Sequence, residues 1–211
     1  MATTLDVTKV EFEIYQTYQD VIAPLIATLE VLDTEYPIEI FNEIRSIFLH
    51  LSRYKVQHSE KDVFTAKRHV KRAILDCYKY ICVSYAEKLE KFRVEYKEVN
   101  LNLADNGNFL PQLNKLDVEA REKLFKAKEF EIQTHLEDSE ANDNYLYSLY
   151  EEAYLSYKGM DDFITASNEA IQFCCSETKK SDMINKASLA FGITGCVVGV
   201  AGIIISILIS I

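Results

Sequence analysis

The residues whose types best suit chemistry lie near position 50, where an arginine and a histidine are five residues apart. Arg45 and His50 would lie about 140° apart around an α-helix, so both flank its apolar stripe and could meet in a cleft at a helix–helix or dimer seam. An imidazole can move a proton at a ribose 2′-hydroxyl while a guanidinium stabilises phosphate charge. The pair therefore predicts metal-free RNA cleavage or, as the alternative, a buried structural contact. The same spacing recurs at Arg53 and His58, so spacing alone has little specificity.

A second polar set follows along the chain at steps of three, four and three residues, which places it on one helical stripe. It consists of His69, Arg72, Asp76 and Lys79. Asp76 can pair with its neighbours as a surface ion ladder, or a member of the set can reach the helix that carries Arg45. With Asn42 and Arg53, these residues form the predicted polar cluster.

Apolar residues at three- and four-residue steps predict an all-α fold, a bundle of four to five long helices. With only six Gly and three Pro, the composition also favours helices. Pro24 should kink the first helix, Gly159 should interrupt the last one, and loops are expected at 101–114 and 137–144. The expected helices are 6–33, 37–55, 60–99, 117–135 and 145–173.

The C-terminal run Ala187–Ile211 carries no charged side chain. As a helix it would be about 37 Å long, enough to cross a hydrocarbon core of about 30 Å. The sequence therefore predicts a C-terminal transmembrane helix, with a helical domain at 1–180 and a membrane segment at 181–211. Because the N-terminal residues lack a signal peptide and Lys179, Lys180 and Lys186 precede the run, we expect a single-pass inner-membrane protein whose soluble domain faces the cytoplasm.

Small residues recur within this run, and in lipid such residues let helices approach closely. They are Gly192, Gly195, Gly199, Gly202 and Ser206. They predict a homo-oligomer assembled through the membrane helix, and a glycine-tolerant lipid anchor is the alternative.

The net charge of −10 hides an asymmetry between two segments. Residues 53–97 contain twelve Lys or Arg and six Asp or Glu, whereas residues 129–177 contain twelve acidic residues and one Lys. These segments either attract each other within the fold or leave a basic face for a phosphate-rich ligand such as RNA.

Cysteine and histidine patterns give no sign of a metal or cofactor site. The five Cys show no CxxC pattern, which suggests reduced thiols, and the four His lack metal-ligand spacing. Cys174 and Cys175 fit either lipidation or half-buried thiols. We expect no cofactor and no metal.

Three stretches resemble helical bundles of the HEPN superfamily: E-I-R at 43–45, H-L-S-R at 50–53 and A-K-R-H-V-K-R-A-I-L-D-C-Y-K at 66–79. That superfamily carries an R-x4–6-H motif at a helix end, which the resemblance assigns to Arg45 and His50. With its apolar run, the chain is similar to the accessory membrane proteins of type VI-B CRISPR systems.

This resemblance implies an oligomeric effector of antiviral defence that perturbs the membrane, with RNA or an RNA-guided complex as a partner of the basic segment 53–97. The alternatives are a membrane-tethered ribonuclease that uses Arg45 and His50, and a non-catalytic tail-anchored adaptor.

Overall fold

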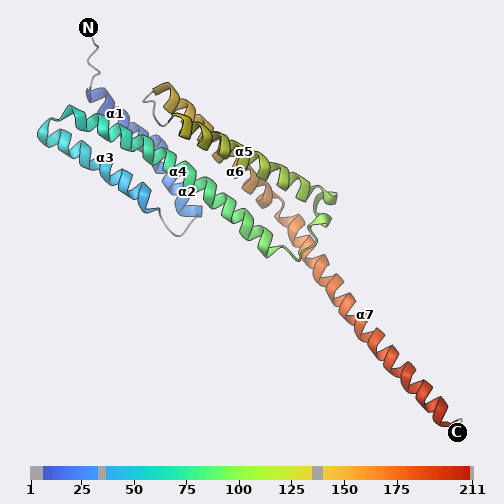
Figure 1. Ribbon diagram of the computed structural model, residues 1–211. Coiled ribbons are helices and arrows are strands. Elements are labelled where there is room, and N and C mark those ends of the chain that lie inside the picture. The colour runs from blue at the N-terminus through green and yellow to red at the C-terminus, as the bar shows by residue number, and fades with distance from the viewer. Residues whose placement is uncertain (1–6, 33–36, 135–139, 210–211) are drawn as a thin grey trace. The chain divides into compact units, whose positions relative to one another are not determined.

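The computed structural model describes residues 7–32, 37–134 and 140–209, and it describes the side chains of this set except at 140, 141 and 190–209. Every described element is helical (Figure 1), so the prediction of an all-α fold is confirmed. The elements are α1 (Val7–Thr17), the π-helix η1 (Tyr18–Ile22), α2 (Ala23–Leu32), α3 (Ile38–Gln57), α4 (Glu60–Glu95), the 3₁₀ segment η2 (Leu101–Gly107), α5 (Phe109–Thr134), α6 (Glu140–Ala166) and α7 (Asn168–Ile209).

The chain divides into two compact units. The first combines the residues up to Glu95 with Leu113–Ile164, and the second combines Tyr96–Gln112 with the residues from Thr165 onward. The predicted domain boundary between residues 180 and 181 falls inside α7, which continues through it.

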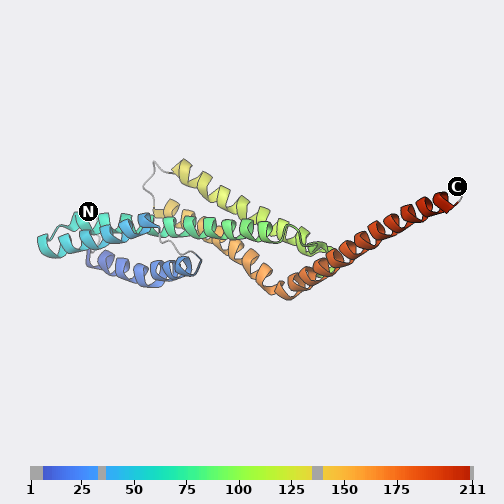
Figure 2. The same ribbon diagram turned by 90° about the horizontal axis from the view of Figure 1, so that it is seen from below.

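In the first unit, α4 is the central helix and packs against α1, α2 and α3. Figure 2 shows α3 antiparallel and adjacent to α4. Ile40 and Ile47 of α3 and Val63 and Ala66 of α4 are almost fully buried. These positions repeat at helical spacing, which is the apolar pattern expected of two packed helices.

The first predicted helix changes its hydrogen bonding just before Pro24, where the sequence predicts a kink. The segment Tyr18–Ile22 is a π-helix, and the N–H of Ala23 donates to the carbonyl of Tyr18. Proline has no N–H to donate, and such a wider turn is one way for a helix to continue past it.

Two predicted interruptions differ from the structure. The loop predicted at 101–114 is shorter, because α5 begins at Phe109, and its turn lies inside the preceding 3₁₀ segment, where Ala104, Asp105 and Asn106 have non-helical backbone angles. Pro111 lies in the first turn of α5, where its missing N–H costs no helical bond. Gly159 lies inside α6, and the break falls instead between Ala166 and Asn168.

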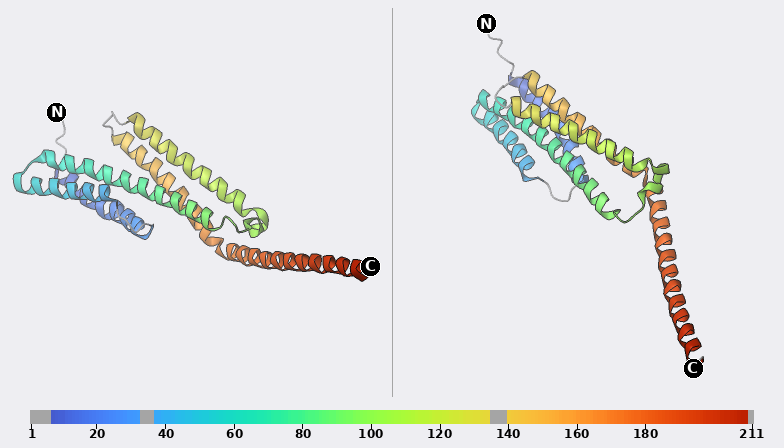
Figure 3. Two further views of the ribbon diagram at one scale, coloured as in Figure 1. Left: turned by 60° about the horizontal axis from the view of Figure 1, so that its bottom comes forward. Right: turned by 45° about the vertical axis from the view of Figure 1, so that its right-hand side comes forward.

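In the second unit, η2 packs against α7. The backbone N–H of Asn100 donates to Thr178 Oγ1 at 3.1 Å, and this hydrogen bond fixes the start of η2 on the long helix. Figure 3 shows α7 as one continuous helix.

The prediction of a C-terminal transmembrane helix is wrong for the described residues, among which no helix is long and apolar enough to cross a membrane. The described side chains of α7 end at Leu189, and this part of the helix is charged through Glu169, Glu177, Lys179, Lys180, Asp182 and Lys186. The small residues Gly192, Gly195, Gly199, Gly202 and Ser206 lie outside the residues whose side chains are described, and their role in assembly stays a prediction.

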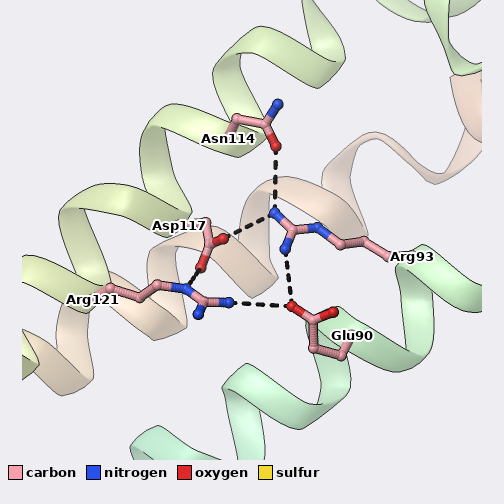
Figure 4. Close-up of polar contacts among 5 residues, drawn as sticks. All are labelled: Glu90, Arg93, Asn114, Asp117 and Arg121. Carbon is pink, nitrogen blue, oxygen red and sulfur yellow. Dashed lines mark hydrogen bonds and ion pairs between the residues drawn. The ribbon is translucent and has the colours of Figure 1, made fainter.

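A ring of charged side chains joins α4 to α5 in the first unit (Figure 4). The buried carboxylate of Asp117 accepts hydrogen bonds from Arg93 Nη2 at 2.9 Å and Arg121 Nε at 2.7 Å. The carboxylate of Glu90 accepts from the same two guanidinium groups at 2.9 and 3.2 Å, and Asn114 Oδ1 accepts from Arg93 at 3.4 Å. Two positive and two negative groups alternate, so the ring compensates the charge that it buries.

Replacing Asp117 with Ala should lower the free energy of unfolding by roughly 1–3 kcal/mol, because two guanidinium groups lose a buried charged acceptor. Urea denaturation followed by circular dichroism measures this change. Glu119→Ala is the matched control on the same helix, since Glu119 only pairs with Lys123 at the surface. Equal losses in the two variants would contradict a stabilising role for the ring.

Candidate functional site

A tight turn fixes how α3 and α4 face each other. His58 ends α3 in the left-handed conformation, with φ at 54°, and its N–H donates to the carbonyl of Tyr54 at 2.8 Å. The N–H of Asp62 donates to the carbonyl of Ser59 at 3.0 Å in the first turn of α4. With only two residues between the helices, the turn allows little freedom in their register.

Two histidine–carboxylate hydrogen bonds cross between these helices. His50 Nδ1 lies 2.6 Å from Asp62 Oδ1, and His69 Nδ1 lies 2.6 Å from Glu43 Oε2. Glu43 lies seven residues before His50 on α3, and His69 lies seven residues after Asp62 on α4. Each helix therefore supplies a carboxylate followed seven residues later by a histidine.

The two imidazole rings stack on each other. Their centroids are 5.3 Å apart and their planes differ by 17°. Side chains lean toward the N-terminus of their own helix, and in an antiparallel pair this brings His50 and His69 toward a common level. Both side chains are 18% exposed, so the rings are half-buried and keep some accessible surface.

The carboxylates determine which ring nitrogen is available. An ionised carboxylate can only accept, so each Nδ1 carries the hydrogen and donates it. In a neutral imidazole this leaves Nε2 with a free lone pair. The hydrogen bond from His50 holds the pKa of Asp62 below its ordinary value, and a hydrogen bond from Ser59 and the charges of His50 and Arg53 act in the same direction. Asp62 is therefore ionised near neutral pH, where the two histidines would act on a substrate.

Three guanidinium groups accompany the histidines. Arg53 follows His50 by about one turn on α3, and Arg72 follows His69 by about one turn on α4. Arg45 is also on α3, and all three arginines are exposed. None of the three makes a hydrogen bond or ion pair within the described part of the chain. They are available to an anion that approaches the imidazoles.

The predicted partner of His50 was Arg45, and the structure instead brings His50 together with His69. Arg45 is exposed, whereas His50 turns toward α4. Asn42 is exposed, and only its backbone carbonyl takes part in a described hydrogen bond, from Ser46 Oγ at 2.9 Å. Catalytic roles for Arg45 and His50 stay predictions.

Asp76 and Lys79 belong to a separate contact with α5. Lys79 Nζ lies 3.8 Å from Asp76 and 2.6 Å from Glu131 of α5. Its ammonium also lies 5.7 Å from the ring centroid of Tyr150. These contacts tie helices together and leave Asp76 and Lys79 engaged within the protein.

Several lysines of the basic segment 53–97 form ion pairs within the first unit. Lys71 pairs with Asp143, Lys79 pairs with Glu131 at 2.6 Å, and Lys88 pairs with Asp161 at 2.6 Å. All three acceptors belong to the acidic segment 129–177. The attraction between the two segments, one of the two interpretations open from the sequence, therefore occurs for these lysines.

Sequence analysis did not assign Glu43 and Asp62 to the site as hydrogen-bond partners. A usable signal was present, because both helices that flank the short turn contain a carboxylate seven residues before a histidine. Positions seven residues apart lie on one helix face. Two such pairs across an antiparallel hairpin would have predicted the crossed hydrogen bonds.

Within the described ranges, no group of three or more His, Cys, Asp and Glu side chains could hold a metal ion. Comparison with protein-family models, curated proteins and solved structures finds no match for this chain. The geometry of the paired histidines therefore carries the functional argument.

The hydrogen bond to His50 should make Asp62 a source of acid sensitivity. A carboxylate with a depressed pKa stabilises the fold above its ordinary pKa, 3.8 here, and loses this contribution as the pH falls through the folded-state value. Wild-type protein should therefore be more stable than Asp62→Asn at neutral pH, and this advantage should disappear in acid. Urea unfolding at a series of pH values measures the difference.

Asp76→Asn is the control with the opposite sign. Burial raises the pKa of Asp76, the charges of Glu43, Glu131 and Glu39 raise it further, and the opposing charge of Lys79 does not cancel this rise. Wild-type protein should thus gain stability relative to Asp76→Asn as the pH falls. A pH-independent difference for Asp62→Asn would show that its hydrogen bond to His50 does not favour the ionised form.

Proposed function

We propose that the chain cleaves RNA by acid–base chemistry at the paired histidines His50 and His69. The observation that carries the proposal is the stack of two half-buried imidazoles, each hydrogen-bonded through Nδ1 to a carboxylate. Cleavage of a phosphodiester by the neighbouring 2′-hydroxyl requires one group that takes a proton and one that gives a proton. The stack supplies two groups of this type at a single place.

In the proposed reaction, a neutral imidazole takes the proton of the 2′-hydroxyl through Nε2. The 2′-oxygen then forms a bond to phosphorus while the bond from phosphorus to the 5′-oxygen breaks. The second imidazole, which enters protonated, gives its proton to the leaving 5′-oxygen. The products are a 2′,3′-cyclic phosphate and a free 5′-hydroxyl, and the pair together has neither gained nor lost a proton.

The surrounding charges favour a phosphate substrate. Arg53 and Arg72 are exposed, each about one turn after a histidine of the site. A guanidinium donates two parallel hydrogen bonds that match phosphate oxygens, and it stabilises the negative charge that grows as the reaction proceeds. Asp62 and Glu43 engage Nδ1 of the two imidazoles, so Nε2 is the nitrogen that takes or gives the proton.

Assembly into an oligomer and recruitment of an RNA-guided complex stay predictions. The proposed cleavage depends only on α3 and α4 of one chain, and it requires neither event.

The proposal is tested with full-length protein and a fluorescent single-stranded RNA. His50→Asn and His69→Asn should each lower the cleavage rate by roughly a hundredfold or more, because each removes one side of the proton transfer. A DNA strand of the same sequence should stay intact since it lacks the 2′-hydroxyl. Addition of a chelator should not change the rate.

His58→Asn is the matched control. His58 has the same spacing from Arg53 that His50 has from Arg45, but it is exposed and ends α3 in a conformation that Asn tolerates. The His58→Asn variant should cleave RNA at the wild-type rate. Intact RNA with wild-type protein, or equal loss in all three variants, would overturn the proposal and leave the histidines as ties between two helices.

A further inference from the structure

Three hollows lie along the first unit beside α4, and they differ in whether a lysine neutralises the carboxylates that line them. One, of about 250 Å³, contains Glu13 and Asp143, which pair with Lys67 and Lys71. Another, of about 430 Å³, contains Asp161, which pairs with Lys88. In both, a lysine of α4 neutralises the acidic groups.

The third hollow, of about 480 Å³, has a different lining, and we call it the tyrosine cavity. Its acidic groups are Asp20 of η1 and Glu151 of α6, and its lining contains no Lys or Arg. Neither carboxylate has a hydrogen bond or ion pair within the described residues. Both carboxylates are exposed, so the cavity has two solvent-accessible negative charges for which the first unit provides no described partner.

Aromatic rings form one wall of the tyrosine cavity. Tyr78, Tyr147 and Tyr154 line it, and the ring centroids of Tyr78 and Tyr154 are 5.9 Å apart. Burial raises the pKa of Tyr78 to about 12, with Glu151 adding to the shift, so this ring stays neutral near neutral pH. The faces of neutral phenol rings are negative and attract cations.

Much of the remaining lining of the tyrosine cavity is apolar. Aliphatic side chains come from Val21, Pro24, Leu25 and Ile74, and two threonines add hydroxyl groups. An inorganic cation would lose its hydration against such a surface without gaining enough oxygen ligands. An organic cation would instead bury its alkyl groups there and keep its charge beside the carboxylates.

We propose that the tyrosine cavity binds an organic ammonium ion. Its rings contact the alkylated cation, its carboxylates balance the charge, and its volume lies in the range of small-molecule sites. The proposal is independent of RNA cleavage, because none of the cavity residues belongs to the histidine site.

Titration of full-length protein with choline and with putrescine tests the proposal. Choline carries a quaternary ammonium and putrescine carries primary ammonium groups, so the tighter ligand identifies the type of cation. Calorimetry and the fluorescence of the tyrosines, in a chain with 13 Tyr and no Trp, both report binding. At least one cation should saturate the protein. The neutral carbon isostere of choline should bind at least about tenfold more weakly than choline.

Glu151→Gln should weaken binding of the cation about tenfold, since the change removes one of the two charges without changing the size of the side chain. Glu152→Gln is the matched control, because both glutamates are exposed but only Glu151 lines the tyrosine cavity. Tyr154→Phe should retain binding, whereas Tyr154→Leu should lose it. Circular dichroism verifies that each variant is folded.

Two results would overturn the proposal. The first is equal affinity for choline and its neutral isostere, which would show that the charge is not recognised. The second is the absence of saturable binding by both cations to folded wild-type protein.

Discussion

Two directional hydrogen bonds between α3 and α4 hold the first unit in one register. Apolar side chains such as Ile47 and Val63 drive the two helices together, but burial of apolar surface has no direction. The bonds from His50 to Asp62 and from His69 to Glu43 form in only one alignment, because a slip of one residue would rotate each partner by about 100° away from the seam. The arginines that flank the histidines, and the face that α4 presents to α1, α2 and α6, all follow from this alignment.

The chain uses its two kinds of cation differently. Lys71, Lys79 and Lys88 each reach a carboxylate of α5 or α6, so the positive charge of α4 is largely neutralised on that side. Arg53 and Arg72 lie near the histidines and remain exposed. Lysine is a compact charge suited to a single partner, whereas the planar fork of arginine suits a phosphate. The ion pairs of α4 thus leave Arg72 exposed one turn after His69, as Arg53 is exposed one turn after His50 on α3.

Periodicity predicted the helices well where apolar residues recur without interruption, as in α3 and α4. It failed where local chemistry permits two outcomes. Asp105, Asn106 and Gly107 do adopt positive φ, as turn residues should, but Phe109 starts a helix at once. The carboxylate partners of the histidines could not be derived from one helix at a time, because each bond joins two helices. The transmembrane prediction relied on the apolar chain end, whereas the described side chains of α7 end at Leu189 and include charged residues up to Lys186.

The order of carboxylate and histidine is the same on α3 and α4, and the helices are antiparallel. A local two-fold axis perpendicular to the hairpin therefore relates Glu43 and His50 to Asp62 and His69, with one methylene as the difference between the halves. Each imidazole has a carboxylate at Nδ1 and an arginine three residues further along its own helix. A bound strand, which has its own polarity, would break this symmetry, and its direction would decide which histidine takes the proton and which gives it.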